Sequence, residues 1–338
     1  MNFLENDMTK SIVELLLQEN IFLVADNNVA KLYPEFTTRN KFLLNAKEEI
    51  KSLEIVSLIT KKMLDSGVNR QTRLVVIGGG LTCDVAGFAA SVYMRGIDWV
   101  CVPTTLLAMV DASIGGKTGV NFERCKNMIG TFYPPQEILV SLHFLRSLNK
   151  RERMSGIGEV IKTAFLDEDL FKFIEMNFKK LFEFDEEVMQ EVVKRCIGIK
   201  KEIVLIDPFE KDGARKILNI GHTIGHALET VGSFSLSHGE YVLFGMLIEG
   251  TIIKKYFTLE KYLPKINFLK KVLKGRKIKF NSDDIVKVCL KDKKNEKGKI
   301  SIVAGFEWET KREYFFSEKE FLASLESSKK EIAEFICL

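Results

Sequence analysis

The chain has 338 residues, of which 46% are hydrophobic and 28% charged, and its formal net charge at pH 7 is +4. Such a chain is long enough for two domains with their own cores, and its composition is that of a globular protein. The small net charge, without a basic block interleaved with aromatics, argues against a nucleic-acid partner, and the lack of a long uncharged apolar run argues against a membrane-spanning helix.

The N-terminal residues and the cysteines predict the compartment. Residues 1–7 have no basic stretch followed by an apolar core, so no signal peptide is expected. The six cysteines form no C-x-x-C pair and are scattered along the chain, at Cys83, Cys101, Cys125, Cys196, Cys289 and Cys337. This pattern fits neither a zinc ribbon nor a disulfide scaffold, and it favours reduced thiols in a cytoplasmic protein.

Short strand-like and helix-like segments alternate in the first part of the chain. After a helix-like segment at residues 8–18, apolar runs predict strands, and spacings of three and four residues predict helices. The strands are expected at 20–26, 73–77 and 99–102, and the helices at 48–64 and 84–94. Strands that alternate with helices are typical of a parallel sheet covered by helices. We therefore predict an α/β domain over residues 1–150, with a Rossmann-like, mostly parallel sheet.

Longer helical segments dominate the second half. They are expected at 152–166, 170–180, 186–206, 217–231, 240–256 and 263–273, and the next strand pattern comes only at 300–303. The lysine-rich stretch 291–299 is most simply a solvated loop. The second domain, residues 151–338, is therefore predicted to be mostly helical.

Two glycine-rich loops lie in the first half. Gly78-Gly79-Gly80 follows a strand and precedes a helix, where backbone N–H groups can hold a pyrophosphate, although a plain tight turn fits equally well. The segment 111–119 resembles a P-loop, but Asp111 replaces the leading glycine and would repel phosphates. Asp111 and Lys117 therefore indicate either an acid and a cation beside one polar ligand or a surface turn. Further polar groups stand at segment ends, at Arg95-Gly96, Thr104-Thr105 and Lys126-Asn127.

Three of the four histidines lie close together in the second half. His222 and His226 are four residues apart, which places them on one face of a helix, and His238 follows. Their spacing alone predicts that His222 and His226 are joint metal ligands, as in helical zinc sites, with a carboxylate such as Glu159 and an open position. The alternative is that one is a core histidine and the other is solvated.

Two glycines and a lysine add to this region. Gly221 and Gly225 fall inside the predicted helix, where each costs about 1 kcal/mol relative to alanine. That cost indicates the close approach of a ligand or of another backbone. Lys162 follows Glu159 by about one turn on the same side of its own predicted helix.

The motifs, taken in order, resemble the 3-dehydroquinate synthase family of sugar-phosphate cyclases. The resemblance covers roughly residues 20 to 305. It is carried by 78–84, Arg95-Gly96, 103–108, Val110-Asp111, 115–118, Lys126-Asn127, Gly130, 158–162, Arg215, Leu218-Asn219, 221–223 and 238–240.

The resemblance implies a bound NAD and one divalent metal, zinc or cobalt. The implied metal ligands are Glu159, His222 and His238, and this set moves His226 to the substrate side. The implied NAD contacts are Asp26, Glu48, Lys51, Gly79, Gly80, Leu81, Asp84, Thr104, Thr105, Asp111, Lys117 and Lys126. The implied substrate and catalytic residues are Arg95, Lys117, Lys126, Asn127, Lys162, Lys201, Arg215, Asn219, His226 and Lys293.

The implied activity is that of a carbon–oxygen lyase of the shikimate pathway, which leads to chorismate and the aromatic amino acids. The enzyme would convert 3-deoxy-D-arabino-heptulosonate 7-phosphate to 3-dehydroquinate and phosphate. NAD would oxidise an alcohol transiently, phosphate would be eliminated, the hydride would return, and an intramolecular aldol step would close the ring. A homodimer is expected.

The sequence leaves other activities open. Aminodehydroquinate, deoxy-inosose and valiolone synthases are related cyclases, and Lys201, Arg215, Asn219 and His226 favour a substrate with a carboxylate over the latter two. A glycerol-dehydrogenase-like enzyme would share the NAD and metal plan but would release its reduced cofactor. A regulatory module would require a broken ligand set, and the set is intact.

The chain departs from the family pattern at three places. Cys83 stands where the family has a glycine, so the packing of the pyrophosphate loop is expected to differ. Lys47 replaces a glycine before Glu48. The N-terminal segment lacks an opening pair of strands, which would change the edge of the sheet.

Overall fold

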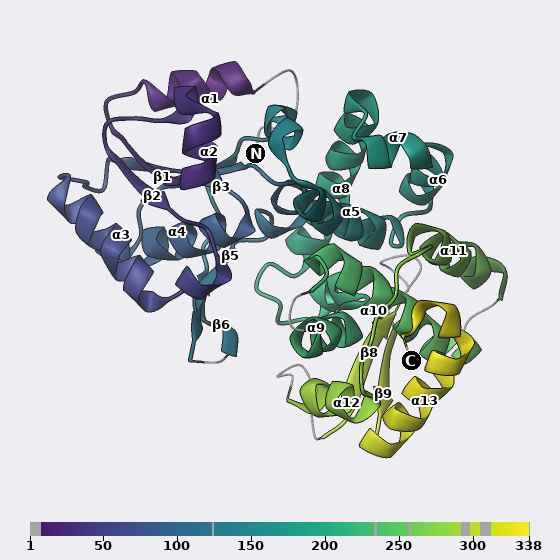
Figure 1. Ribbon diagram of the computed structural model, residues 1–338. Coiled ribbons are helices and arrows are strands. Elements are labelled where there is room, and N and C mark those ends of the chain that lie inside the picture. Colours follow the sequence, from purple (N-terminus) through teal and green to yellow (C-terminus); the bar gives the residue numbers. More distant parts are fainter. Residues whose placement is uncertain are drawn as a thin grey trace. The chain divides into compact units, whose positions relative to one another are not determined.

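The computed structural model describes residues 8–123, 125–232, 235–256, 259–291, 298–304 and 312–337 (Figure 1). The chain divides into two compact units. The first is Met1–Arg153 with Glu186–Lys201, and the second is Met154–Asp185 with Glu202–Leu338. The segment Glu186–Lys201 thus packs with the first unit, although the division predicted at residue 150 would place it in the second domain. The role predicted for each domain stays a prediction.

A five-stranded parallel sheet in the order β2-β1-β3-β4-β7 forms the centre of the first unit. Its strands are β1 (Ile21–Asp26), β2 (Lys41–Leu44), β3 (Arg73–Gly78), β4 (Trp99–Pro103) and β7 (Glu137–Ile138). Nearly every residue of β1, β3 and β4 is buried, as expected for strands that helices cover on both faces. The prediction of an α/β fold with a mostly parallel sheet is confirmed.

The register aligns the carboxyl ends of three strands at one edge of the sheet. Ala25 pairs with Ile77, and Gly78 pairs with Pro103. The strand order also reverses at β1, because β2 lies on one side of β1 and the next strand, β3, lies on the other. Ligands of open α/β sheets bind at such a switch point, outside the carboxyl ends of the strands.

Helices and a hairpin complete the first unit. They are α1 (Thr9–Leu16), α2 (Asn27–Leu32), η1 (Pro34–Phe36), η2 (Glu48–Ile50), α3 (Leu53–Asp65), α4 (Gly80–Val92), η3 (Tyr93–Arg95), η4 (Ala108–Ala112), η5 (Leu142–Ser147), and the antiparallel pair β5 (Lys117–Phe122) and β6 (Cys125–Phe132). α4 begins four residues before the predicted start, because Gly79 serves as its N-cap. The hairpin was not predicted, since β6 is exposed along almost its whole length and shows no apolar alternation.

The second unit is mostly helical, as predicted. Its elements are most of α5 (Lys150–Ala164), α6 (Glu168–Met176), α7 (Phe178–Glu183), η6 (Ala214–Asn219), α9 (His222–Val231), α10 (His238–Ile253), η7 (Lys254–Tyr256), α11 (Leu259–Val272), α12 (Ser282–Leu290), α13 (Glu318–Glu331), η9 (Ala333–Phe335), and the antiparallel pair β8 (Ile300–Ala304) and β9 (Arg312–Phe316). α5 begins in the first unit, and α8 (Glu186–Ile206) belongs to the first unit up to Lys201 and ends in the second.

Helix α10 forms the centre of this helical unit. Almost all its residues are buried, and it packs against α9, α11 and α13 (Figure 1). A helix that is apolar all round belongs in a protein core or a membrane. In the described part of the chain, no helix combines the length and apolar composition needed to cross a bilayer.

Candidate active site

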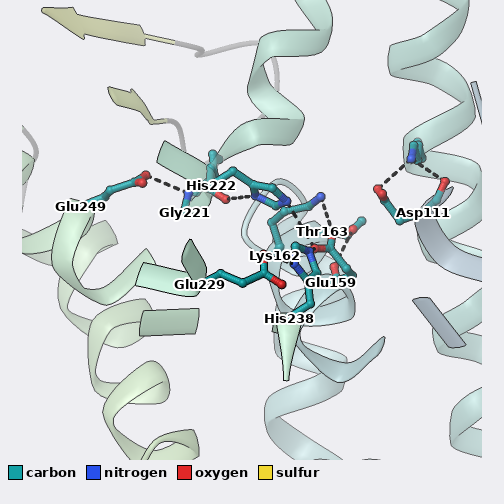
Figure 2. A network of polar contacts seen from close by, with 11 residues as sticks. Asp111, Glu159, Lys162, Thr163, Gly221, His222, Glu229, His238 and Glu249 are labelled. Atoms are coloured by element: carbon teal, nitrogen blue, oxygen red, sulfur yellow. Dashed lines mark hydrogen bonds and ion pairs between the residues drawn. The ribbon is translucent and has the colours of Figure 1, made fainter. Parts of the chain in front are cut away.

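Glu159, His222 and His238 meet in the second unit (Figure 2). Glu159 lies on α5, and each histidine is the first residue of its helix, α9 or α10. The Nε2 atoms of His222 and His238 lie 3.4 Å and 3.3 Å from Oε1 of Glu159. Side chains from three helices thus converge at the Glu159 carboxylate.

A glycine contact brings α5 and the start of α10 together. A Cβ atom on Gly158 would lie 2.3 Å from Cα of Gly239, and one on Gly239 would lie 2.3 Å from the carbonyl oxygen of Met154. No real side chain tolerates such a distance, so both positions require glycine for this approach. Because Gly158 precedes Glu159 and Gly239 follows His238, the contact sets the separation of these two side chains.

The start of α9 is fixed by its N-cap, Gly221. This residue has φ +75°, which favours glycine. The expectation that Gly221 lies inside the helix was wrong: it stands at the N-cap, and only Gly225 is internal. His222 Nδ1 lies 3.0 Å from the carbonyl oxygen of Ile220, which directs Nε2 toward Glu159.

Glu249 of α10 stabilises this turn. Its buried carboxylate accepts hydrogen bonds from the backbone N–H groups of Gly221 and Ile224, each at 2.8 Å. A carboxylate at a helix N-terminus satisfies orphan donors and complements the helix dipole. Glu249 therefore supports the backbone that carries His222.

Replacing Glu249 with glutamine is expected to lower the free energy of unfolding by about 2 kcal/mol, because hydrogen bonds to a charged acceptor contribute about 1.5–3 kcal/mol. Urea unfolding followed by circular dichroism measures the change. Glu175→Gln, on the exposed face of α6, is the matched control and should have almost no effect. Equal midpoints for the two variants would contradict a structural role of Glu249.

The Glu159 carboxylate is 1% exposed and lies among cations. Lys162, also buried, forms an ion pair with Oε2. Burial opposes ionisation, but Lys162 and His222 outweigh it and hold the pKa of the Glu159 carboxyl well below its usual range. Among the described residues, neither oxygen of Glu159 accepts a hydrogen bond of good geometry.

The two imidazoles respond in opposite directions. Burial lowers the pKa of His222, and Glu159 only partly offsets this effect. Burial also works against the charge of His238, but the nearby carboxylates of Glu159 and Glu229 raise its pKa to about 9. The Glu159 carboxylate is ionised and buried away from water, and two imidazole nitrogens lie beside it. These three groups fit the donor set of a divalent cation such as zinc.

His226 lies on α9 beside this cluster. Ligand atoms of His222, His226 and His238 lie within 4.8 Å of one another, and the rings of His222 and His226 are 4.9 Å apart. Geometry alone therefore allows a three-histidine set as well. The buried, unsatisfied oxygens of Glu159 favour the set that includes this carboxylate, and the ligand assignment stays a prediction.

A second cluster lies in the first unit, around Lys51. The Lys51 ammonium is buried and lies 2.6 Å from Oδ2 of Asp84 and 2.5 Å from Oδ1 of Asn127. Burial raises the pKa of the Asp84 carboxyl, and Lys51 opposes this rise. Glu48 accepts a hydrogen bond at 2.8 Å from Asn121, which also receives the backbone N–H of Asn127. Three of the predicted NAD contacts and one predicted substrate contact are thus joined.

Asp111 pairs with a lysine that the sequence did not single out. Nζ of Lys200 lies 2.7 Å from Oδ1 of Asp111 and 2.5 Å from its carbonyl oxygen. Lys200 is buried on α8, whereas the predicted residue, Lys201, is exposed. The three- and four-residue spacing of α8 could have distinguished them, because Lys200 continues a buried stripe that contains Cys196 and Ile203.

The other predicted residues lie at element ends or outside these contacts. Asp26 caps α2, and burial raises the pKa of its carboxyl. The remainder comprises Gly79, Gly80 and Leu81 at the start of α4, Thr104 and Thr105 after β4, exposed Lys117 and Lys126, Arg95 at φ +67°, and Arg215 and Asn219 in η6. Lys293 and most of the lysine-rich stretch lie outside the described residues.

Cys83 contacts the glycine turn and a second buried thiol. Its Sγ lies 3.2 Å from Sγ of Cys101 and 3.7 Å from the carbonyl oxygen of Gly78, and both thiols are buried. Cysteine at position 83 is therefore compatible with the turn at Gly78 and with the start of α4 at Gly80.

Solved structures of cyclising synthases share this fold of a parallel-sheet unit and a helical unit. The fold is shared with 2-epi-5-epi-valiolone synthase of Streptomyces hygroscopicus subsp. jinggangensis 5008, solved with NAD⁺ and Zn²⁺ bound. The two chains are 25% identical, with a TM-score of 0.80 and coverage of 92% of each.

The chain belongs to the 3-dehydroquinate synthase family. Residues 41–155 match the family's N-terminal domain model and residues 156–295 match its C-terminal domain model. It is 41% identical over 297 residues to the 3-dehydroquinate synthase of Alkaliphilus metalliredigens (84% of this chain, 83% of the relative). It is 38% identical over 321 residues to that of Pelagibacter ubique (88% and 87%). The predicted family is confirmed.

Proposed function

We propose that this chain is a 3-dehydroquinate synthase, a lyase that converts 3-deoxy-D-arabino-heptulosonate 7-phosphate to 3-dehydroquinate and phosphate. Family membership over most of the chain supports this activity in preference to the other cyclases. The observation that carries it is the buried Glu159 carboxylate, which meets two imidazoles and an ammonium and has unsatisfied oxygens.

The first unit would hold NAD and the second the metal. Glu159, His222 and His238 are the proposed ligands of a zinc or cobalt ion. The backbone N–H groups at the start of α4, next to Gly79 and Gly80, suit a pyrophosphate, since a helix N-terminus favours anions. When bound, NAD supplies a transient hydride acceptor, and the cation acts as a Lewis acid toward the substrate alcohol.

The cationic side chains would bind the two acidic groups of the substrate. Lys162 is buried, so its charge is little screened by water and can hold negative charge on the substrate. Arg215 is buried as well, with its backbone N–H held by Asp207, and its planar fork suits a carboxylate. Lys200 is proposed for the role that the resemblance implies for Lys201, because Lys200 is the buried lysine and contacts Asp111.

The proposed activity is tested by following phosphate release and NADH together, with the heptulosonate phosphate and its amino analogue compared. We expect phosphate to be released without a net build-up of NADH, and activity to be lost with EDTA and restored by zinc or cobalt. Steady accumulation of NADH would instead indicate a glycerol-dehydrogenase-like enzyme. Faster turnover of the amino analogue would indicate an aminodehydroquinate synthase.

We further propose that the enzyme is a cytoplasmic homodimer. All six cysteines are free, which suits a reducing compartment. Light scattering coupled to size-exclusion chromatography measures the mass in solution, and a monomer mass would contradict the dimer.

A further inference from the structure

Both ring nitrogens of His238 face a carboxylate. Nε2 lies 3.3 Å from Oε1 of Glu159, and Nδ1 lies 3.4 Å from Oε2 of Glu229. Figure 2 shows the Glu229 carboxylate beside the His238 ring. The Glu229 side chain is 15% exposed, so water screens this contact only weakly.

The two proposed histidine ligands are held in different ways. His222 Nδ1 faces the carbonyl oxygen of Ile220, which the N-cap turn of its own helix keeps in place. In His238 the same ring atom faces a carboxylate from another helix. Glu229 lies on α9, two turns after His222, and α9 packs against α10. The partner of Nδ1 is therefore a side chain in His238 and a backbone carbonyl group in His222.

We propose that Glu229 is a positioning residue that fixes the tautomer and the ring orientation of His238 for the metal. Where a metal replaces the proton on Nε2, the imidazole would keep its Nδ1–H, which donates a hydrogen bond to Glu229, and would present the Nε2 lone pair on the side of Glu159. Carboxylates that accept the second N–H of a histidine ligand also increase the basicity of the ligating nitrogen. The inference rests on the metal site of the proposed function, and it adds a group that does not itself touch the metal.

Metal affinity is the readout, measured on the full chain without substrate. The apo-proteins of wild type, Glu229→Ala and Glu229→Gln compete with a chromophoric chelator for Zn²⁺. Loss of such an outer carboxylate weakens metal binding by about 10- to 100-fold, and we expect this for the alanine variant. Glutamine keeps an acceptor oxygen near Nδ1, so a smaller loss is expected. Glu175→Ala on α6 is the control and should bind Zn²⁺ like wild type.

A double-mutant cycle with His238→Ala separates positioning from a general structural effect. If Glu229 acts through His238, Glu229→Ala should cause no further loss of Zn²⁺ affinity once His238 is absent. An equal loss in both backgrounds would overturn the inference. Should the alanine variant fail to fold, Glu229→Gln decides: an unchanged Zn²⁺ affinity and an unchanged visible spectrum of the Co²⁺ form would also overturn it.

The same cycle distinguishes this inference from the proposed metal site. Metal lost in His238→Ala but retained at wild-type affinity in Glu229→Ala would refute only the role of Glu229. Metal retained in His238→Ala would refute the ligand set, and the role of Glu229 with it.

Discussion

His238→Ala is expected to lose the metal and the activity, whereas His226→Ala is expected to keep the metal. The reason is the buried carboxylate of Glu159, whose Oε1 lies 3.3 Å from His238 and 3.4 Å from His222. Removing a direct ligand should weaken binding more than the roughly 10- to 100-fold typical of an outer-shell partner. We therefore expect at least a hundredfold loss of Zn²⁺ affinity in His238→Ala.

Metal content after dialysis, measured by elemental analysis, tests this difference. His143→Ala is the control, because His143 packs against Tyr33 in the first unit, at 5.0 Å between ring centres, and should keep its metal. His226→Ala should bind zinc but turn over substrate slowly. Equal metal loss in His226→Ala and His238→Ala would assign the metal to the three histidines instead.

The sheet could be predicted from the sequence because its strands are buried on both faces. Such strands appear as continuous apolar runs, as β1, β3 and β4 do. Their parallel pairing followed from the intervening helices. The exposed strand β6 has no such pattern, since its residues face water rather than a core.

The metal cluster could be located from the sequence only in part. Spacing on one helix predicted that His222 and His226 act together, because a helix fixes neighbours within a turn. It could not bring Glu159 to His238, which depends on the contact between Gly158 and Gly239 on two separate helices. The family resemblance supplied that pairing, and the structure shows the contact that makes it possible.

The second large effect is expected at Lys200. Its ammonium bridges the carboxylate and the carbonyl oxygen of Asp111, which lies in the π-helical turn η4. Lys200→Ala removes both contacts and leaves a partly buried carboxylate without this cation. Breaking a buried ion pair costs about 3–5 kcal/mol, but the Asp111 side chain is 26% exposed, so water reduces the loss and we expect about 2 kcal/mol.

The expected effect on catalysis is larger than the effect on stability. Asp111 is a proposed NAD contact, and displacing a positioned group by about 1 Å can reduce the rate a hundredfold. We therefore expect kcat/KM of Lys200→Ala to fall by about a hundredfold, with a higher KM for NAD. Lys201→Ala provides the matched control, because the neighbouring lysine is exposed on the same helix and its loss should change kcat/KM less than threefold.

Steady-state kinetics and urea unfolding of both variants separate the two lysines. The resemblance implies this role for Lys201, whereas the burial of Lys200 favours Lys200. A large loss in Lys201→Ala with normal turnover in Lys200→Ala would restore the first assignment. Asp111→Asn adds a further check: if Lys200 acts through Asp111, the amide removes the charge partner, and adding Lys200→Ala should then lower kcat/KM by much less than in the wild-type background.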